Sequence, residues 1–168
     1  HVLSIKETIE SNISGKILLS YSSVKDYTNL YDCFVKCNKK MDIVKRFHLD
    51  IEIIKENEVI FEEIIESINK EKKEELINEY SKGFKKLDLD MMKTIDVFFN
   101  CGLNLSEAAK ELYIHRNTLI YRLEKIQKYT GFDIKNFNEA VIFKSIYTVW
   151  KEENKKKKKN METTLENV

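Results

Sequence analysis

Seven polar side chains between residues 115 and 125 carry the charges, donors and acceptors that contact nucleic acids. They are His115, Arg116, Asn117, Thr118, Tyr121, Arg122 and Lys125. Arginine can bond both acceptors of guanine, asparagine can bond adenine, and the threonine methyl group can touch that of thymine. Lysine, threonine and tyrosine can hold phosphates and so fix the register on a duplex. We interpret these residues as candidate DNA contacts.

Each of these residues also has a purely structural alternative. His115 could cap the helix that follows it, and Thr118 and Tyr121 could serve helix initiation and packing. Arg122 could form a salt bridge with Glu124 or Asp96, and Lys125 could be an ordinary exposed lysine.

Two short helices joined by a tight turn must position these side chains. The first is predicted from the N-cap residue Asn104 with its capping-box partner Glu107, and it carries the small residues Ala108 and Ala109. The second runs from Arg116 to about Tyr129, with Leu119, Leu123 and Ile126 on one face, and Gly131 ends it. A helix-turn-helix that places its second helix in the major groove of DNA requires this arrangement.

The segment NLSEAAKELYIHRNTLIYRLEKIQKYTG, residues 104–131, resembles the C-terminal helix-turn-helix of the PucR/CdaR family of bacterial transcription regulators. The capped NLSEAA helix, the HRNTL turn and the trailing TG carry the resemblance, which extends with flanking helices over residues 88–150. One departure is Ile120, where the family often has arginine; losing that cation would weaken or alter DNA contact. The resemblance implies sequence-specific binding of double-stranded DNA, with the helix from Arg116 in the major groove.

The other regions are predicted from apolar spacing and capping signals. Short strands are predicted at Lys16–Tyr21 and Ile51–Lys55. Helices are predicted over 26–47 and 71–86 and after a cap at Asn57. Two further helices are predicted, one from a cap at Asp90 to Gly102 and one from an Asn136–Glu139 capping box through Trp150. The fold class is therefore mainly α, with a helix-turn-helix bundle preceded by a small α/β remnant. In this family a degenerate GGDEF-like domain often precedes the reader. The resemblance thus assigns 1–56 to the end of such a domain, 57–87 to connecting helices, 88–150 to the helix-turn-helix domain and 151–168 to a basic, disordered tail.

Composition excludes several classes of protein. Proline is absent, glycine occurs four times, and 29 basic residues nearly balance 28 acidic ones. No P-loop, HExxH or GxSxG pattern is found, so we expect neither enzymatic activity nor a cofactor. Cys33 and Cys37 share a helical face but lack the further ligands that zinc needs, so no metal site is predicted. No apolar run reaches the ~20 residues of a membrane helix, and no signal peptide is visible, which indicates a cytoplasmic protein without a membrane partner.

Partners follow from the size of one reading helix. A single helix reads only a few base pairs, so a homodimer on two half-sites is expected. The dimer surface would come from the apolar helix 139–150 or from an upstream domain. Such a domain is expected to be missing from this sequence, because the chain begins at His1 and not at a methionine. A small-molecule effector would act on that upstream domain. The competing hypothesis is a helical protein-interaction or dimerisation module that does not bind DNA. Residues 88–150 favour it, since they carry eight basic and eight acidic side chains, whereas DNA-binding domains are often basic.

Overall fold

The structure, a computed structural model, describes residues 1–24, 26–55 and 57–166 and confirms a mainly α fold. The chain divides into two compact units, His1–Ile68 and Asn69–Val168. We describe each unit by itself. None of the helices in the described residues is both long and apolar enough to cross a membrane.

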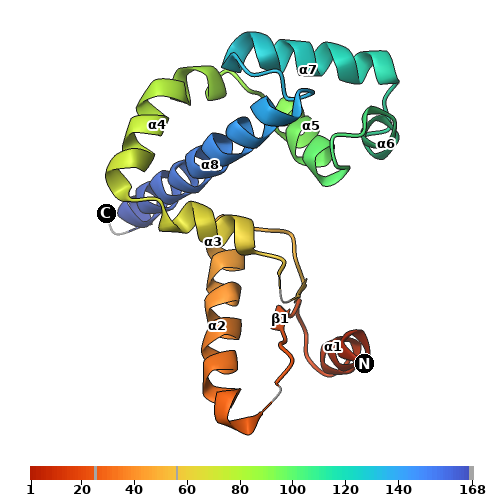
Figure 1. The fold of residues 1–168 in the computed structure, drawn as a ribbon, viewed down its shortest axis with the longest axis vertical. Helices are drawn as coiled ribbons and strands as arrows, with labels where there is room; N and C mark the ends of the chain where they lie inside the picture. The colour runs from red at the N-terminus through yellow and green to blue at the C-terminus, as the bar shows by residue number, and fades with distance from the viewer. Residues whose placement is uncertain (25, 56, 167–168) are drawn as a thin grey trace. The chain divides into compact units, whose positions relative to one another are not determined.

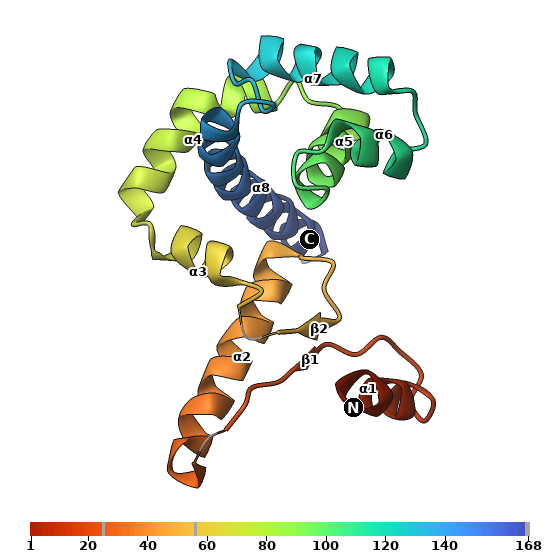
Figure 2. The same cartoon turned by 45° about the vertical axis from the view of Figure 1, so that its right-hand side comes forward.

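Unit 1 surrounds a very small parallel sheet. Its elements are α1 (Val2–Glu10), β1 (Leu19–Ser20), the 3-10 turn η1 (Tyr27–Asn29), α2 (Leu30–Phe47), β2 (Ile53–Ile54) and α3 (Ile60–Ser67). The two strands pair in parallel, Leu19 with Ile53 and Ser20 with Ile54, and they lie side by side in Figure 2. Both predicted strands are therefore confirmed, although each is only two residues long. The sequence did not predict α1, and the assignment of this unit to a GGDEF-like domain stays a prediction.

Two predicted helix starts in unit 1 differ from the structure. Asp26 caps the short turn η1, where its side chain accepts a hydrogen bond from the Thr28 amide (3.2 Å), so α2 begins only at Leu30. Asn57 does not cap α3, whose N-cap position is taken by Val59. The side chain of Val59 is buried, so packing rather than a capping bond sets where this helix begins.

Unit 2 is a bundle of helices that encloses the larger core. Its elements are α4 (Lys70–Phe84), α5 (Leu89–Asn100), α6 (Leu105–Glu111), α7 (Arg116–Thr130) and α8 (Phe137–Glu166), and Figure 1 shows α4 beside α8 and α6 joined to α7 by a tight turn.

Asn69 caps α4 by accepting from the Lys72 amide (2.8 Å). The predicted Asp90 cap is wrong, because Asp88 accepts from the Met91 amide (2.8 Å) and caps α5. Asp90 lies in the first turn instead, where its carboxylate is free for another contact.

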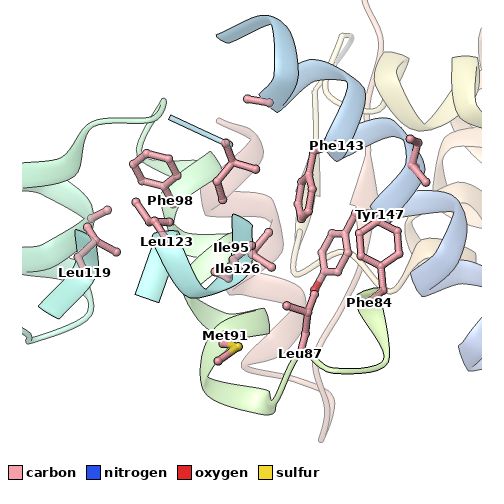
Figure 3. Close-up of a cluster of buried hydrophobic side chains, with 14 of the residues drawn as sticks. Phe84, Leu87, Met91, Ile95, Phe98, Leu119, Leu123, Ile126, Phe143 and Tyr147 are labelled. Carbon is pink, nitrogen blue, oxygen red and sulfur yellow. The ribbon is translucent and has the colours of Figure 1, made fainter. Parts of the chain in front are cut away.

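Four of these helices contribute the large side chains of the core of unit 2, which also includes Ala108 and Ala109 of α6. Figure 3 shows the side chains that converge there: Phe84 and Leu87 from α4 and the segment after it, Met91, Ile95 and Phe98 from α5, Leu119, Leu123 and Ile126 from α7, and Phe143 and Tyr147 from α8. Phe84 contacts Phe143 edge to face (5.6 Å between ring centroids) and lies 5.4 Å from Trp150. Burial of this many large side chains fixes the orientation of α7 relative to its neighbours.

The C-terminal segment differs from the predicted disordered tail. The helix α8 continues past residue 150 to Glu166, and Glu152 is only 4% exposed. Lys151 pairs with Asp96 (2.9 Å), and Lys156 pairs with Glu152 (2.8 Å). Lysine and glutamate are good helix formers and no proline or glycine interrupts them, so the helix continues beyond the last core residue, Trp150. The side chains of residues 157–166 lie outside the described part of the structure.

One glycine brings two helices of unit 2 into backbone contact. A Cβ atom on Gly83 of α4 would lie 2.5 Å from the carbonyl oxygen of Tyr129 and 3.1 Å from the Cα of Thr130 in α7. Both atoms belong to the backbone, so a rotamer change cannot relieve the clash.

We therefore predict that Gly83→Ala destabilises unit 2. Overpacking costs about 1–3 kcal/mol and alanine regains about 1 kcal/mol of helix propensity. The difference is a fall of up to about 2 kcal/mol in the free energy of unfolding, measured by a urea titration followed by circular dichroism. Asn78→Ala, at an exposed position of the same helix, is the matched control and should be neutral or slightly stabilising. A more stable Gly83→Ala protein would show that the close approach is not needed.

Candidate nucleic-acid interface

The helix α6 begins at a capped and solvent-exposed end. The Asn104 Oδ1 accepts hydrogen bonds from the amides of Ser106 (3.0 Å) and Glu107 (3.2 Å). In a complete capping box the Glu107 carboxylate would accept a hydrogen bond from the Asn104 amide. Here the Asn104 amide donates to the Cys101 carbonyl instead (3.1 Å), so only the backbone amide of Glu107 takes part in the cap. Ala108 and Ala109 are buried, which allows α6 to pack closely on α5 and α7.

The turn between α6 and α7 is fixed by backbone hydrogen bonds. The Tyr113 amide donates to the Lys110 carbonyl (3.1 Å), and the Ile114 amide donates to the Ala109 carbonyl (3.0 Å). Tyr113 has a left-handed backbone with φ of 55°. His115 then caps α7, since its Nδ1 accepts from the Asn117 amide (3.3 Å). This capping bond requires the neutral imidazole to carry its proton on Nε2.

The helix α7 has one buried face and one exposed face. Leu119, Leu123 and Ile126 are at most 2% exposed and pack into the core of unit 2, as Figure 3 shows. The exposed positions of its first two turns are Arg116, Asn117, Thr118 and Tyr121, and Tyr121 is 65% exposed. No hydrogen bond or ion pair within the described residues engages these four side chains. The structure thus brings together most of the predicted site residues on a surface open to a ligand.

Arg122 is the predicted site residue that the structure engages elsewhere. Its guanidinium is half-buried, donates to the Thr94 Oγ1 (3.2 Å) and lies 3.5 Å from the Asp90 carboxylate. Both partners belong to α5, and Thr94 is fully buried. Arg122 therefore fastens α7 to α5, and its ion-pair partner is neither Glu124 nor Asp96.

Lys125 lies at the edge of the exposed face. Its ammonium group is 5.8 Å from the centre of the Tyr129 ring, and Lys86 approaches the same ring at 5.9 Å. Cations at these distances are attracted by the electron-rich face of the ring. Lys125 is thus half-buried against Tyr129, and its charge remains part of the positive side of α7, where Glu124 is the one acidic residue.

Sequence reasoning missed two polar residues of α6. Ser106 and Lys110 lie one turn apart and are both exposed, on the side of α6 opposite the buried alanines. In a helix-turn-helix the first helix crosses the phosphate backbone of DNA, so the position of these two residues on that helix was the signal that could have made them candidate phosphate contacts. Glu107 and Glu111 are exposed on the same helix, which keeps α6 itself close to neutral.

No metal site accompanies this surface. In the parts of the chain that the structure describes, no group of three or more histidine, cysteine, aspartate or glutamate residues lies close enough to hold a metal ion. Cys33, Cys37 and Cys101 are half-buried free thiols.

The capped α6, the tight turn and the half-buried α7 define a helix-turn-helix domain. Residues 91–145 match the model of the PucR C-terminal helix-turn-helix domain family. This match includes residues 104–131, whose resemblance to the same family the sequence indicated, and it supports that prediction for this part of the chain.

Three bacterial relatives are similar to part of the chain. The protein YxkF of Bacillus subtilis is 34% identical over 85 residues, which are 51% of this chain and 29% of the relative. The purine catabolism regulatory protein of Bacillus subtilis is 43% identical over 49 residues, 29% of this chain and 9% of the relative. The carbohydrate diacid regulator of Escherichia coli is 36% identical over 52 residues, 31% of this chain and 14% of the relative. The similarity therefore spans less than a third of the length of each of these relatives.

The contact between Arg122 and α5 gives a prediction about stability. Arg122→Ala removes the packed stem of the side chain and a hydrogen bond to a buried hydroxyl, so it should lower the free energy of unfolding by about 1–2 kcal/mol. Asp90→Ala should cost less than about 0.5 kcal/mol, because the carboxylate is largely exposed and screened by solvent. Thermal unfolding measures both. Lys128→Ala, which removes an exposed cation of the same helix, is the control; equal stability of the Arg122 and Lys128 variants would contradict the assigned role.

Proposed function

We propose that this chain is part of a bacterial transcription regulator and that its helix-turn-helix domain binds double-stranded DNA sequence-specifically. The observation that carries the proposal is the division of α7, whose apolar face is buried while Arg116, Asn117, Thr118 and Tyr121 stay exposed and unengaged in the described structure. The family match and the regulator names of the relatives support it. They also favour a regulatory over an enzymatic protein, one that acts in the cytoplasm beside the chromosome.

In this proposal the first two turns of α7 enter the major groove, which is about 12 Å wide. Arg116 contacts guanine, Asn117 contacts adenine, and Thr118 touches a thymine methyl group or a phosphate. Tyr121 and Lys125 hold phosphates along the groove. His115 offers its Nε2–H to the DNA, because its Nδ1 is occupied by the cap.

The near-neutral charge of the domain does not contradict this assignment. Five residues on α7 are charged: four are basic and one is acidic. The basic charge is thus concentrated on the helix that would approach DNA, and the acidic charge is distributed over the other helices. Binding affinity depends on charges near the phosphates more than on the sum over the domain.

We further propose that the DNA-bound form is a homodimer. One helix contributes too few base contacts for a genomic site, and two half-sites about one helical turn apart would double them. The helix 139–150 offers less surface than its composition indicated, because many of its apolar side chains are buried in the domain's own core: Ala140, Phe143, Ile146, Tyr147 and Trp150. An effector that acts on another part of the longer regulator remains part of the proposal.

The alternative is a protein-interaction module, and one observation favours it. Phe137, Val141 and Ile142 are exposed on one side of α8, with Phe137 70% exposed. Apolar residues grouped in this way are typical of protein–protein contacts. This surface does not involve α7, so a binding measurement separates the two functions.

The decisive prediction concerns Arg116. Fluorescence anisotropy with the duplex upstream of the chain's own operon should give tight binding that weakens as salt is raised. Arg116→Ala should weaken this binding by about 5- to 150-fold, the value of one good bidentate base contact. Lys82→Ala removes the same charge from an exposed position of α4 and should leave the affinity within about twofold.

Two outcomes would contradict the proposal. Equal effects of the Arg116 and Lys82 substitutions would show that α7 is not the reading helix. A folded chain that binds no DNA, even when it is dimerised by a fused coiled coil, would favour the interaction module.

A further inference from the structure

The end of α6 contains a residue that is unfavourable for the fold at its position. The two hydrogen bonds from Tyr113 and Ile114 back to Lys110 and Ala109 form the helix-ending motif in which one residue must be left-handed. Glycine suits this position because a side chain there crowds the backbone. In α6 the position is held by Tyr113, with φ of 55°.

The same domain uses glycine where the motif occurs one helix earlier. At the end of α5 the amides of Gly102 and Leu103 donate to Phe99 and Phe98 (3.0 Å each), and Gly102 has φ of 59°. The helix α7 also ends at a left-handed glycine, Gly131, with φ of 83°. Tyrosine at the end of α6 is therefore an exception within this domain.

The Tyr113 side chain gains nothing in the fold that would offset this strain. It is 95% exposed, and within the described residues it makes no hydrogen bond and no ring contact. Leu103 is also left-handed (φ of 65°), but its side chain packs against the core and so gains burial. A strained backbone that presents a fully exposed aromatic side chain indicates a role outside the fold.

We propose that Tyr113 is a positioning residue for DNA, whose hydroxyl donates a hydrogen bond to a backbone phosphate at the edge of the groove that α7 enters. This inference rests on the proposed function. The turn lies between α6, which would cross the phosphate backbone, and α7, which would enter the groove, so it passes over one strand. Tyrosine hydroxyls are common donors to phosphate oxygens. Two backbone hydrogen bonds fix the backbone from which the side chain projects, and a ring with few rotatable bonds loses little conformational entropy on binding.

This contact has three signatures. It carries no sequence information, so its loss weakens binding to the operator and to an unrelated duplex by the same factor. Tyrosine is uncharged, so its loss leaves the salt dependence of binding unchanged, unlike the loss of a lysine or arginine. Its strain is relieved by glycine, so the variant that binds DNA less well is the more stable protein.

The test compares Tyr113→Gly and Tyr113→Phe by anisotropy at several salt concentrations and by thermal unfolding. Tyr113→Gly should raise the thermal midpoint by about 4 °C or more and weaken binding to both duplexes about tenfold. Tyr113→Phe should leave the midpoint unchanged and weaken binding by a similar factor, because only the hydroxyl is lost. The controls are Tyr27→Phe, an 87% exposed tyrosine of unit 1, and His48→Gly, a left-handed residue at the end of α2; both should bind DNA normally.

Each other outcome has a definite meaning. Normal binding by both Tyr113 variants overturns this inference and leaves the proposed function intact, provided that Arg116→Ala still loses affinity. Loss with glycine but not with phenylalanine overturns the hydroxyl contact in favour of the ring. A lower thermal unfolding midpoint for Tyr113→Gly overturns the claim that Tyr113 strains the backbone without making a stabilising contact in the fold. A folded chain that binds no DNA, even when it is dimerised by the fused coiled coil, overturns the proposed function and this inference with it.

Discussion

The burial of one face of α7 is the interaction on which the rest of the domain depends. Leu119, Leu123 and Ile126 pack among side chains from α5 and α8, so the helix cannot rotate without exposing them. Because the helix is a cylinder, fixing the buried face also fixes which residues face the solvent. The small side chains of α6 and the capping bonds of Asn104 and His115 then set how the chain enters α7. The core therefore positions the exposed face of α7, whose side chains need no hydrogen bonds among themselves to hold that position.

Local signals predicted the local structure of this domain well. Asn104, Gly102 and Asn136 act within four residues of their own positions, and their side chains or backbones adopt the expected cap and turn geometry. Asp90 was misassigned because two aspartates, Asp88 and Asp90, lie at the start of α5 and the sequence does not show which one caps the helix. The role of Arg122 depends on Thr94, 28 residues away, and that of Gly83 on Tyr129. Such contacts follow from how the helices pack, which no local pattern contains.

Unit 1 also has features that local sequence patterns do not determine. Its two strands were recognisable from their apolar residues, yet their length depends on a partner strand that lies more than thirty residues away. The helix α1, which the sequence did not predict, buries Lys6, which pairs with Glu10 and Glu52, while Leu3, Ile5 and Ile9 are exposed. Its apolar pattern is therefore the reverse of that of a helix packed on a core. At the other end of the chain, ion pairs extend α8 beyond the point where apolar spacing stops.

The contact between Gly83 and the end of α7 also has a mechanical consequence. Side chains between two helices normally absorb small displacements by changing rotamer, but here backbone meets backbone. The positions of α4 and α7 therefore depend directly on each other at this contact, without a side chain between them. Under the proposed function, the orientation of the reading helix thus depends on a contact that involves none of the residues that face the DNA.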